Sequence, residues 1–218
     1  MKKITILLAA ILLLFIAIPN QGISQENHGS NSPRFGIKGG VNFSNLYTND
    51  NSEASMLTGY HFGLLCKVPI TRIVAIQPEL YLTTKGAEVK YNSLFIDGTA
   101  SFKLNYLEMP LLIVVNITPN FNIHFGPYGA FLINGKARNV SNISLFNFEQ
   151  NIDTHDYNRW DAGIAVGAGI DLGALSIGAR YNYGLTNVGT EKTFMGITYL
   201  VPDANNGVIN IYLSLSLN

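Results

Sequence analysis

The stretch WDAGIAVGAGIDLGALSIGARYNYGL, residues 160–185, decides the fold. Read in steps of two, it puts large apolar residues on one side and small or polar residues on the other, and the pattern restarts after Gly173-Ala174. Successive side chains of a β-strand point to opposite faces, so this alternation predicts two antiparallel strands joined by a tight turn. A helix would scatter Asp171 and Arg180 onto the apolar side.

The two faces of these strands are inverted relative to a soluble sandwich, in which large apolar residues pack inside. Here one face carries glycine, serine, asparagine and isolated charges, and its mostly small side chains would suit a crowded interior. That arrangement is typical of a transmembrane β-barrel, whose apolar side chains face lipid and whose interior is polar. Both strands reach the length of about 9–11 residues that a membrane-spanning strand needs.

The rest of the chain repeats the pattern. Alternating runs also cover residues 34–46, 57–68, 73–86, 103–117, 121–134 and 208–217. Long polar connections at 47–56, 87–102, 135–157 and 187–207 alternate with short ones, as in barrels with short periplasmic turns and long extracellular loops. We therefore predict an all-β fold over residues 34–218: an eight-stranded antiparallel up-and-down transmembrane β-barrel with four long extracellular loops.

Three prolines interrupt the predicted strands. Pro78, Pro110 and Pro127 cannot donate a ladder hydrogen bond, which usually argues against a central strand. We expect a β-bulge at each of them, because a bulge would accommodate the missing donor.

Composition and targeting signals agree with an exported membrane protein. Only 13% of the 218 residues are charged and the formal net charge is zero, against about 25% charged residues in an average soluble domain. Lys2-Lys3, an apolar run and small residues before Gln25 predict a signal peptide over residues 1–24, followed by a flexible lead-in over 25–33. The alternative for this segment is a membrane anchor. The chain lacks a polybasic face, so we expect no nucleic-acid partner.

Several motifs then suggest a family. GIKGGVNFSNL at 36–46, QPELYLTTKG at 77–86, NYLEMPLLI at 105–113 and GPYGAFL at 126–132 occur in this order. With them the sequence resembles the PorT-like outer-membrane β-barrel family of Bacteroidota, a porin family with an outer membrane protein beta-barrel domain. The resemblance implies the cell outer membrane, an eight-stranded barrel, and no catalytic residues or cofactors. One type of member takes part in protein secretion.

Candidate catalytic and metal residues are few. Asp153, His155 and Asp156 would form an acid–base site on the barrel rim, but no nucleophile or second histidine lies near them in sequence, and a solvated polar loop is the favoured alternative. His61 and His124 are expected to point into the lumen, where a metal would need a third ligand at matched depth. We predict no catalytic, cofactor or metal site.

Charges on the inward face form the main candidate site. Eight strands leave an interior just wide enough for side chains to fill it, and a charge there needs a partner. Counting residues from the turns places Glu79 and Arg180 at similar depth, with Glu108 somewhat higher, so we expect Arg180 to pair with Glu79, Glu108 or both. The predicted structural network is Lys38, Glu79, Glu108 and Arg180, and ten inward residues are expected in all: Lys38, Lys67, Gln77, Glu79, Tyr81, Glu108, Tyr128, Asp171, Arg180 and Tyr212.

The function expected from these features is non-enzymatic. A barrel with a plugged lumen would act through its extracellular loops in envelope interaction, adhesion or assembly of a secretion or envelope complex. Its partners would be outer-membrane lipid, the barrel-assembly machinery during biogenesis, and envelope or secretion proteins. Two alternatives stay open at this point: an outer-membrane enzyme with a rim site, a hydrolase or acyltransferase, and a soluble periplasmic ligand-binding barrel.

Overall fold

The computed structural model describes residues 32–47, 54–93, 96–142, 147–152, 158–187, 192–194, 197–199 and 205–217. The predicted signal peptide, residues 1–24, and most of the lead-in lie outside these ranges. So do Asp153, His155 and Asp156, the candidate rim site. The described part of the chain contains no helix long and apolar enough to span a membrane.

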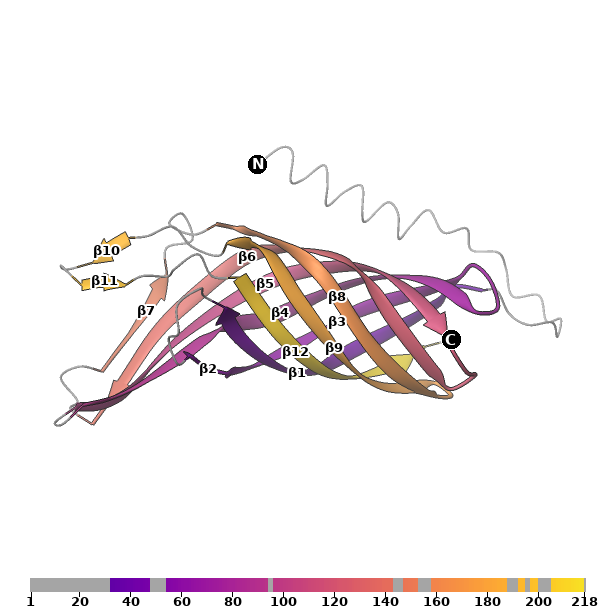
Figure 1. Ribbon diagram of the computed structural model, residues 1–218. Coiled ribbons are helices and arrows are strands. Elements are labelled where there is room, and N and C mark those ends of the chain that lie inside the picture. Colours follow the sequence, from indigo (N-terminus) through magenta and orange to yellow (C-terminus); the bar gives the residue numbers. More distant parts are fainter. Residues whose placement is uncertain are drawn as a thin grey trace. The chain divides into compact units, whose positions relative to one another are not determined.

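Within the described ranges, eight long strands form one closed antiparallel ring (Figure 1). Each strand pairs with the next along the chain, and β1 pairs with β12 to close the ring. This confirms the predicted all-β, up-and-down architecture. The ring strands are β1 (Arg34–Tyr47), β3 (Leu57–Pro69), β4 (Val74–Ser93), β5 (Ile96–Asn116), β6 (Phe121–Ser141), β8 (Trp160–Leu172), β9 (Leu175–Asn187) and β12 (Asn205–Ser216).

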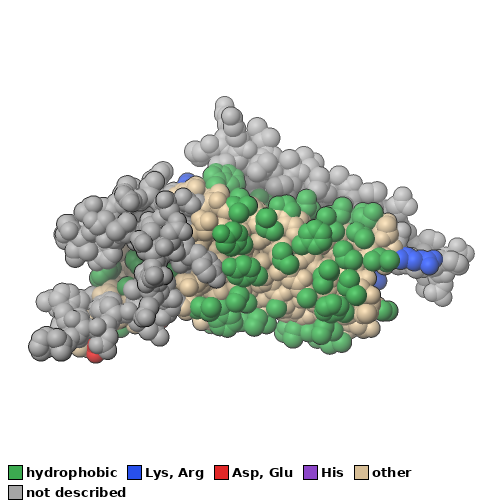
Figure 2. Space-filling view, in the orientation of Figure 1, with side chains coloured by type: hydrophobic (Ala, Val, Ile, Leu, Met, Phe, Trp, Pro, Cys, Tyr) green, Lys and Arg blue, Asp and Glu red, His purple; other side chains and the backbone are tan. Residues whose placement is uncertain are grey.

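The side chains separate into two faces as the alternation predicts. Ile164, Val166 and Leu111 are about half exposed and point outward, whereas Glu79 and Arg180 are each 2% exposed and point inward. Figure 2 shows the outer wall covered with apolar side chains. All ten residues expected inside are buried or half-buried. Because a shift of one residue would exchange the faces, the register of every strand is set by this pattern.

Three short connections between ring strands lie at one end, which we call the turn end. There β3 joins β4, β5 joins β6, and β8 joins β9 through residues 70–73, 117–120 and 173–174. At the last of these, Gly173 has a φ of +70°, a conformation that glycine adopts without steric cost. The other connections between ring strands lie at the opposite end, which we call the loop end.

Two of the four expected long loops are largely β-structure. Strands β4 and β5 stay paired as far as Ser93↔Ile96, and β6 continues to Ser141. The strands therefore continue into the segments predicted as loops, 87–102 and 135–157. Beyond the lipid band the wall no longer needs apolar residues on one face. The apolar–polar alternation therefore ends before the strand does, although the backbone pairing continues.

Short strands complete the loop end. β7 (Phe148–Ile152) pairs with β6, and β2 (Ala54–Ser55) pairs with β4. β10 (Lys192–Phe194) and β11 (Ile197–Tyr199) form a separate hairpin.

The prediction of a bulge at each proline was wrong. The register is the same on both sides of all three, and the irregularities fall elsewhere, at Asn105/Tyr106 and Asn205/Gly207. A strand in a closed ring is held from both sides, so one missing donor does not force an extra residue into it. The prolines pair as Pro78↔Leu111, Pro110↔Tyr128 and Pro127↔Ile164.

Candidate functional site

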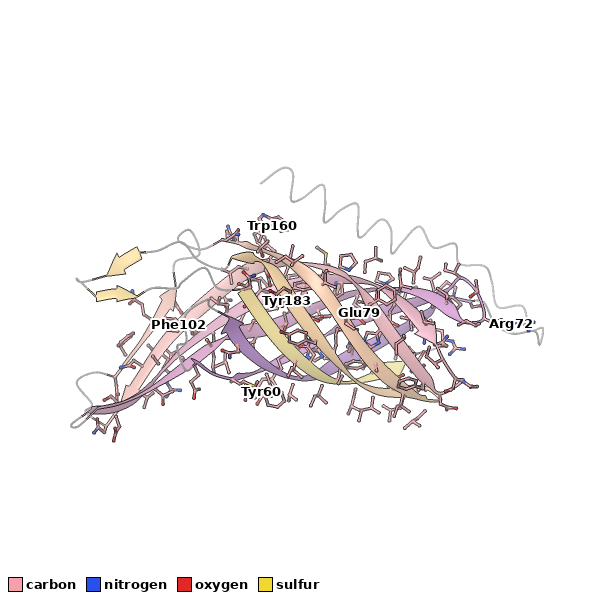
Figure 3. All side chains as sticks on the ribbon, viewed as in Figure 1. Tyr60, Arg72, Glu79, Phe102, Trp160 and Tyr183 are labelled. Carbon is pink, nitrogen blue, oxygen red and sulfur yellow. The ribbon has the colours of Figure 1, made fainter. Side chains whose placement is uncertain are left out.

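The lumen near the turn end is crossed by an ion-pair cluster built on Glu79. Arg180 donates from Nη1 to Oε2 of Glu79 at 2.7 Å and from Nη2 to Oε1 at 2.9 Å. Lys38 Nζ lies 3.2 Å from both oxygens, and Gln77 Nε2 donates to Oε1 at 2.7 Å. The three charged residues come from strands β1, β4 and β9, so the cluster ties together three sides of the wall. Figure 3 shows Glu79 between Arg72 at the turn end and Phe102 beyond the loop end.

A second cluster lies nearer the loop end and is built on Lys85. Its Nζ lies 2.6 Å from Glu108 Oε2 and 2.8 Å from Asp161 Oδ2, and all three side chains are buried. Glu108 Oε1 also accepts hydrogen bonds from the Tyr81 hydroxyl at 2.7 Å and from Asn182 Nδ2 at 2.6 Å. The second cluster therefore reaches across the lumen from β4 to β5, β8 and β9.

The structure places the four network residues predicted from sequence in two different clusters. Lys38, Glu79 and Arg180 meet, whereas Glu108 pairs with Lys85 instead of Arg180. Sequence reasoning missed Lys85 and Asp161 as members, although both stood on the inward face. Counting residues from a turn gives depth along one strand, but the stagger between strands decides which side chains of equal depth meet.

The charges of the two clusters balance as a pair but not singly. The cluster near the turn end holds two cations, Lys38 and Arg180, around one carboxylate, Glu79. The cluster near the loop end holds one cation, Lys85, between Glu108 and Asp161. Buried charges are tolerated only when they are paired and hydrogen-bonded, and these arrangements supply both conditions.

Between and around the clusters the interior is packed. Lys85 Nζ lies 4.5 Å from the centre of the Tyr128 ring, and Lys38 Nζ lies 3.8 Å from that of Tyr212, which places both amines over aromatic faces. A buried apolar group fills the side formed by β4, β5, β6 and β8. Its members are Ala75, Leu104, Tyr106, Leu112, Val114, Tyr128, Ala130, Leu132 and Ala165. The lumen is thus filled by side chains over the depth of both clusters.

Glycines on the inner wall make room for this filling. A Cβ at Gly63 would collide with the Leu80 carbonyl and with Tyr81, and one at Gly163 would lie 2.7 Å from the Tyr128 ring. These positions belong to the small face that the sequence alternation predicts, and their smallness lets large polar side chains from other strands occupy the centre.

Each of the two inward histidines contacts an asparagine side chain. His61 Nδ1 lies 2.6 Å from Asn42 Oδ1, and His124 Nδ1 lies 3.3 Å from Asn122 Oδ1. Among the described residues, no group of three or more His, Cys, Asp or Glu side chains is arranged to hold a metal ion.

Beyond the loop end, the paired parts of β4, β5 and β6 together with β2 and β7 form what we call the extension. Directly opposite residues share a face of a sheet, so Lys103↔Lys136 and Arg138↔Glu149 present charged side chains on one side. Glu149 accepts a hydrogen bond from Lys136 Nζ at 3.1 Å, and this bond lowers the pKa of its exposed carboxyl. The other side carries apolar residues, including Phe102, Ala137 and Phe148.

A closed ring of eight strands with lipid-type side chains outside and ion pairs inside defines the class of transmembrane β-barrels. Residues 23–189 match the model of a family described as "Outer membrane protein beta-barrel domain", and the chain belongs to this family. The protein is therefore located in the cell outer membrane, and the alternative of a soluble periplasmic barrel is wrong. Membership of the narrower PorT-like family stays a prediction.

Similar solved structures are also outer-membrane proteins. Ail, the attachment invasion locus protein of Yersinia pestis, is 16% identical over 85% of this chain and 99% of its own, with a TM-score of 0.45. Neisserial surface protein A is 13% identical over 84% and 97%, with a TM-score of 0.46. OprG from Pseudomonas aeruginosa is 13% identical over 87% and 98%, with a TM-score of 0.42. Likeness this distant says nothing about ligands or partners. A comparison with curated proteins found no match.

Proposed function

We propose that this protein is a non-enzymatic, plugged outer-membrane barrel that acts through the extension in envelope interaction, adhesion or assembly of an envelope complex. The observation that carries the proposal is the paired continuation of β4 and β5 beyond the ring. Eight ladder pairs, from Gly86↔Lys103 to Ser93↔Ile96, follow the last inward charge of β4, Lys85. At about 3.3 Å per residue these pairs add roughly 25 Å of strand.

Strand of this length is not needed to cross a bilayer. A spanning strand takes about 9–11 residues, and β4 and β5 have 20 and 21. Ordering each extra residue costs roughly 1–2 kcal/mol of backbone entropy, so an ordered sheet outside the membrane needs a reason other than anchoring. Presentation of a rigid surface to another molecule would be such a reason.

The chemistry of the extension fits a protein or envelope-polymer partner. One side offers Lys103, Lys136 and Arg138, and the other offers Phe102 and the half-exposed Phe148. Aromatic and arginine side chains are the residues most enriched where protein surfaces bind one another. The filled lumen supports the same proposal. Because side chains fill the lumen at the depth of the two clusters, passage of solutes through the barrel is not favoured, and the surface outside the membrane is the better candidate.

Replacement of residues 87–102 by a two-residue turn tests the proposal. The ring would keep its pairs up to Lys85↔Leu104, so we expect folded, heat-resistant barrel in the outer membrane at the native level. Crosslinking on intact cells followed by affinity capture should recover a specific partner with the native chain and lose it with the shortened chain.

A matched control alters a turn at the other end of the barrel. Substitution of Thr118, Pro119 and Asn120 changes a turn at the turn end and should leave capture unchanged. Undiminished capture or cell adhesion by the shortened chain would contradict the proposal.

A further inference from the structure

A polar pocket opens at the turn end, below the Glu79 cluster. It has a volume of about 70 Å³ and is lined by residues of seven of the eight ring strands and of the turn at Gly173. A water molecule needs about 10–15 Å³ of such space, so the pocket has room for a few waters or for one small tetrahedral oxyanion. Its position near Arg34 and Gly173, beside three chain connections, faces it toward the periplasm.

We propose that this pocket binds a phosphate-type oxyanion from the periplasm. The lining includes three basic side chains, Arg34, Lys38 and Lys67, and one acidic side chain, Asp171. This excess of positive charge lies directly against the cluster that itself holds two cations around Glu79. Together Arg34, Lys38, Lys67 and Arg180 exceed Glu79 and Asp171 by two positive charges, and an anion in the pocket would reduce this excess.

Lys38 is the residue that joins the pocket to the cluster. Arg180 takes the two short bonds of Glu79, at 2.7 and 2.9 Å, and Lys38 lies farther away, at 3.2 Å from each oxygen. Its side chain is 2% exposed, so water screens its charge poorly. An ammonium group has three donors, and its contacts with Glu79 leave it able to donate to a ligand in the pocket as well.

Two more polar groups line the pocket: Lys67, a donor, and His124. Lys67 is 20% exposed and makes long contacts, 3.3 Å to Asp171 and 3.5 Å to Asn116. His124 is 2% exposed, and its Nε2 has no hydrogen-bond partner among the described residues. Asn122 donates from Nδ2 to Asp171, which orients its Oδ1 toward His124 Nδ1 and assigns the proton of the neutral imidazole to Nδ1. Nε2 is then an acceptor.

An acceptor beside two ammonium groups selects the kind of anion. Near neutral pH inorganic phosphate is a mixture of H2PO4⁻ and HPO4²⁻, and a phosphate monoester is partly protonated. Each of these protonated forms can donate an O–H to an imidazole while its other oxygens accept from lysines. Carboxylate and sulfate carry no such proton at this pH. The chemistry is shared by free inorganic phosphate and by phosphate monoesters, and the pocket volume favours the smaller of these.

NMR spectroscopy of the full chain in lipid nanodiscs tests the proposal. Titration with inorganic phosphate at constant ionic strength should give saturable shifts of the amides of Lys38, Lys67, His124 and Tyr212. Lys38→Met should weaken binding about tenfold or more, the size expected for loss of a charge-assisted hydrogen bond. Lys136→Gln removes a cation at the loop end and should leave binding unchanged.

Parallel titrations define the ligand. Glycerol 3-phosphate binding more tightly than inorganic phosphate would assign the site to a monoester, and the reverse would assign it to the free ion. If Lys38→Met does not fold, the same titration is carried out with Lys67→Gln, because Lys67 is a partly exposed residue of the pocket lining. Shifts that do not saturate, that persist in both lysine variants, or that acetate or sulfate reproduces equally would overturn the proposal.

Discussion

At the scale of single residues, Glu79 holds the lumen together more than either cation beside it. Glu79→Gln would leave Lys38 and Arg180 facing each other without a counter-charge, whereas Arg180→Met would leave a neutral Lys38–Glu79 pair. We expect Glu79→Gln to cost about 3–5 kcal/mol of folding free energy, the range for an uncompensated buried charge, and Arg180→Met to cost less.

Urea unfolding of the barrel in lipid vesicles measures this order. The exposed Glu149→Gln is the control, and it should leave the free energy of unfolding of the whole barrel nearly unchanged. A larger loss for Arg180→Met than for Glu79→Gln would show that Glu79 is not the shared anion.

Two glycines give a matched pair of predictions about packing. A Cβ at Gly63 would collide with Leu80 and Tyr81, while one at Gly129 would have nothing within 4 Å. Gly63→Ala should therefore destabilise the barrel by about 1–3 kcal/mol through overpacking, and Gly129→Ala should be neutral or stabilising by up to about 1 kcal/mol. The fraction of heat-resistant barrel on unheated gels measures the stability of both variants. Equal fractions for the two variants would mean that the backbone at Gly63 and the side chain of Tyr81 can move apart to accept a Cβ.

Much of the residue-level pattern could be predicted from the sequence, because a period of two fixes which face each side chain takes. Val166 outside and Arg180 inside followed from that period alone. The partner of Glu108 could not be predicted, because it depends on the stagger of β4 against β5 and β8. The sequence pattern of a single strand contains no information about that stagger.

At the scale of elements, the pairing of β7 with β6 should depend on pH. Glu149 lies in β7 and its pKa is lowered by the hydrogen bond from Lys136 of β6. A carboxyl with a depressed folded-state pKa stabilises the pairing above its unfolded-state value and loses that contribution as the pH falls through the folded-state value. We expect β7 amides to lose protection from hydrogen exchange below about pH 4.

The variant Lys136→Gln checks the cause. It should return the pKa of Glu149 toward the ordinary glutamate value in an NMR titration, and β7 should no longer respond to pH in this range. A pKa that stays low in Lys136→Gln would assign the effect to Arg138 and Lys103, the other cations that act on Glu149.

Element lengths were harder to predict than element faces. The ends of β4, β5 and β6 lie beyond the lipid band, where Glu88 and Lys103 can face water and no apolar alternation marks the strand. Proline led to a wrong prediction for a different reason. The rule that excludes proline from central strands considers only the hydrogen-bond donor that is lost. Pro110 lacks that donor, but the residues around it stay in register with both neighbouring strands.

At the scale of the whole molecule, the two charge clusters make the barrel a poor channel. Lys85, Glu108 and Asp161 close the lumen toward the loop end, and the Glu79 cluster closes it toward the turn end. Planar-bilayer recordings of single refolded barrels should therefore show no stable, large conductance steps. Glu108→Ala combined with Asp161→Ala is the comparison, and it should raise leak currents by leaving Lys85 to attract water.

The closing seam between β1 and β12 has a consequence for how the protein is made. Gly36 pairs with Ser216, so the ring can be completed only after almost the entire described chain has emerged. Contacts between residues so distant in sequence raise the contact order, and chain entropy must be lost before they form, which slows folding. Until then both terminal strands expose unpaired edges that invite aggregation. Correct assembly therefore requires that the seam closes faster than the exposed strand edges associate with other chains.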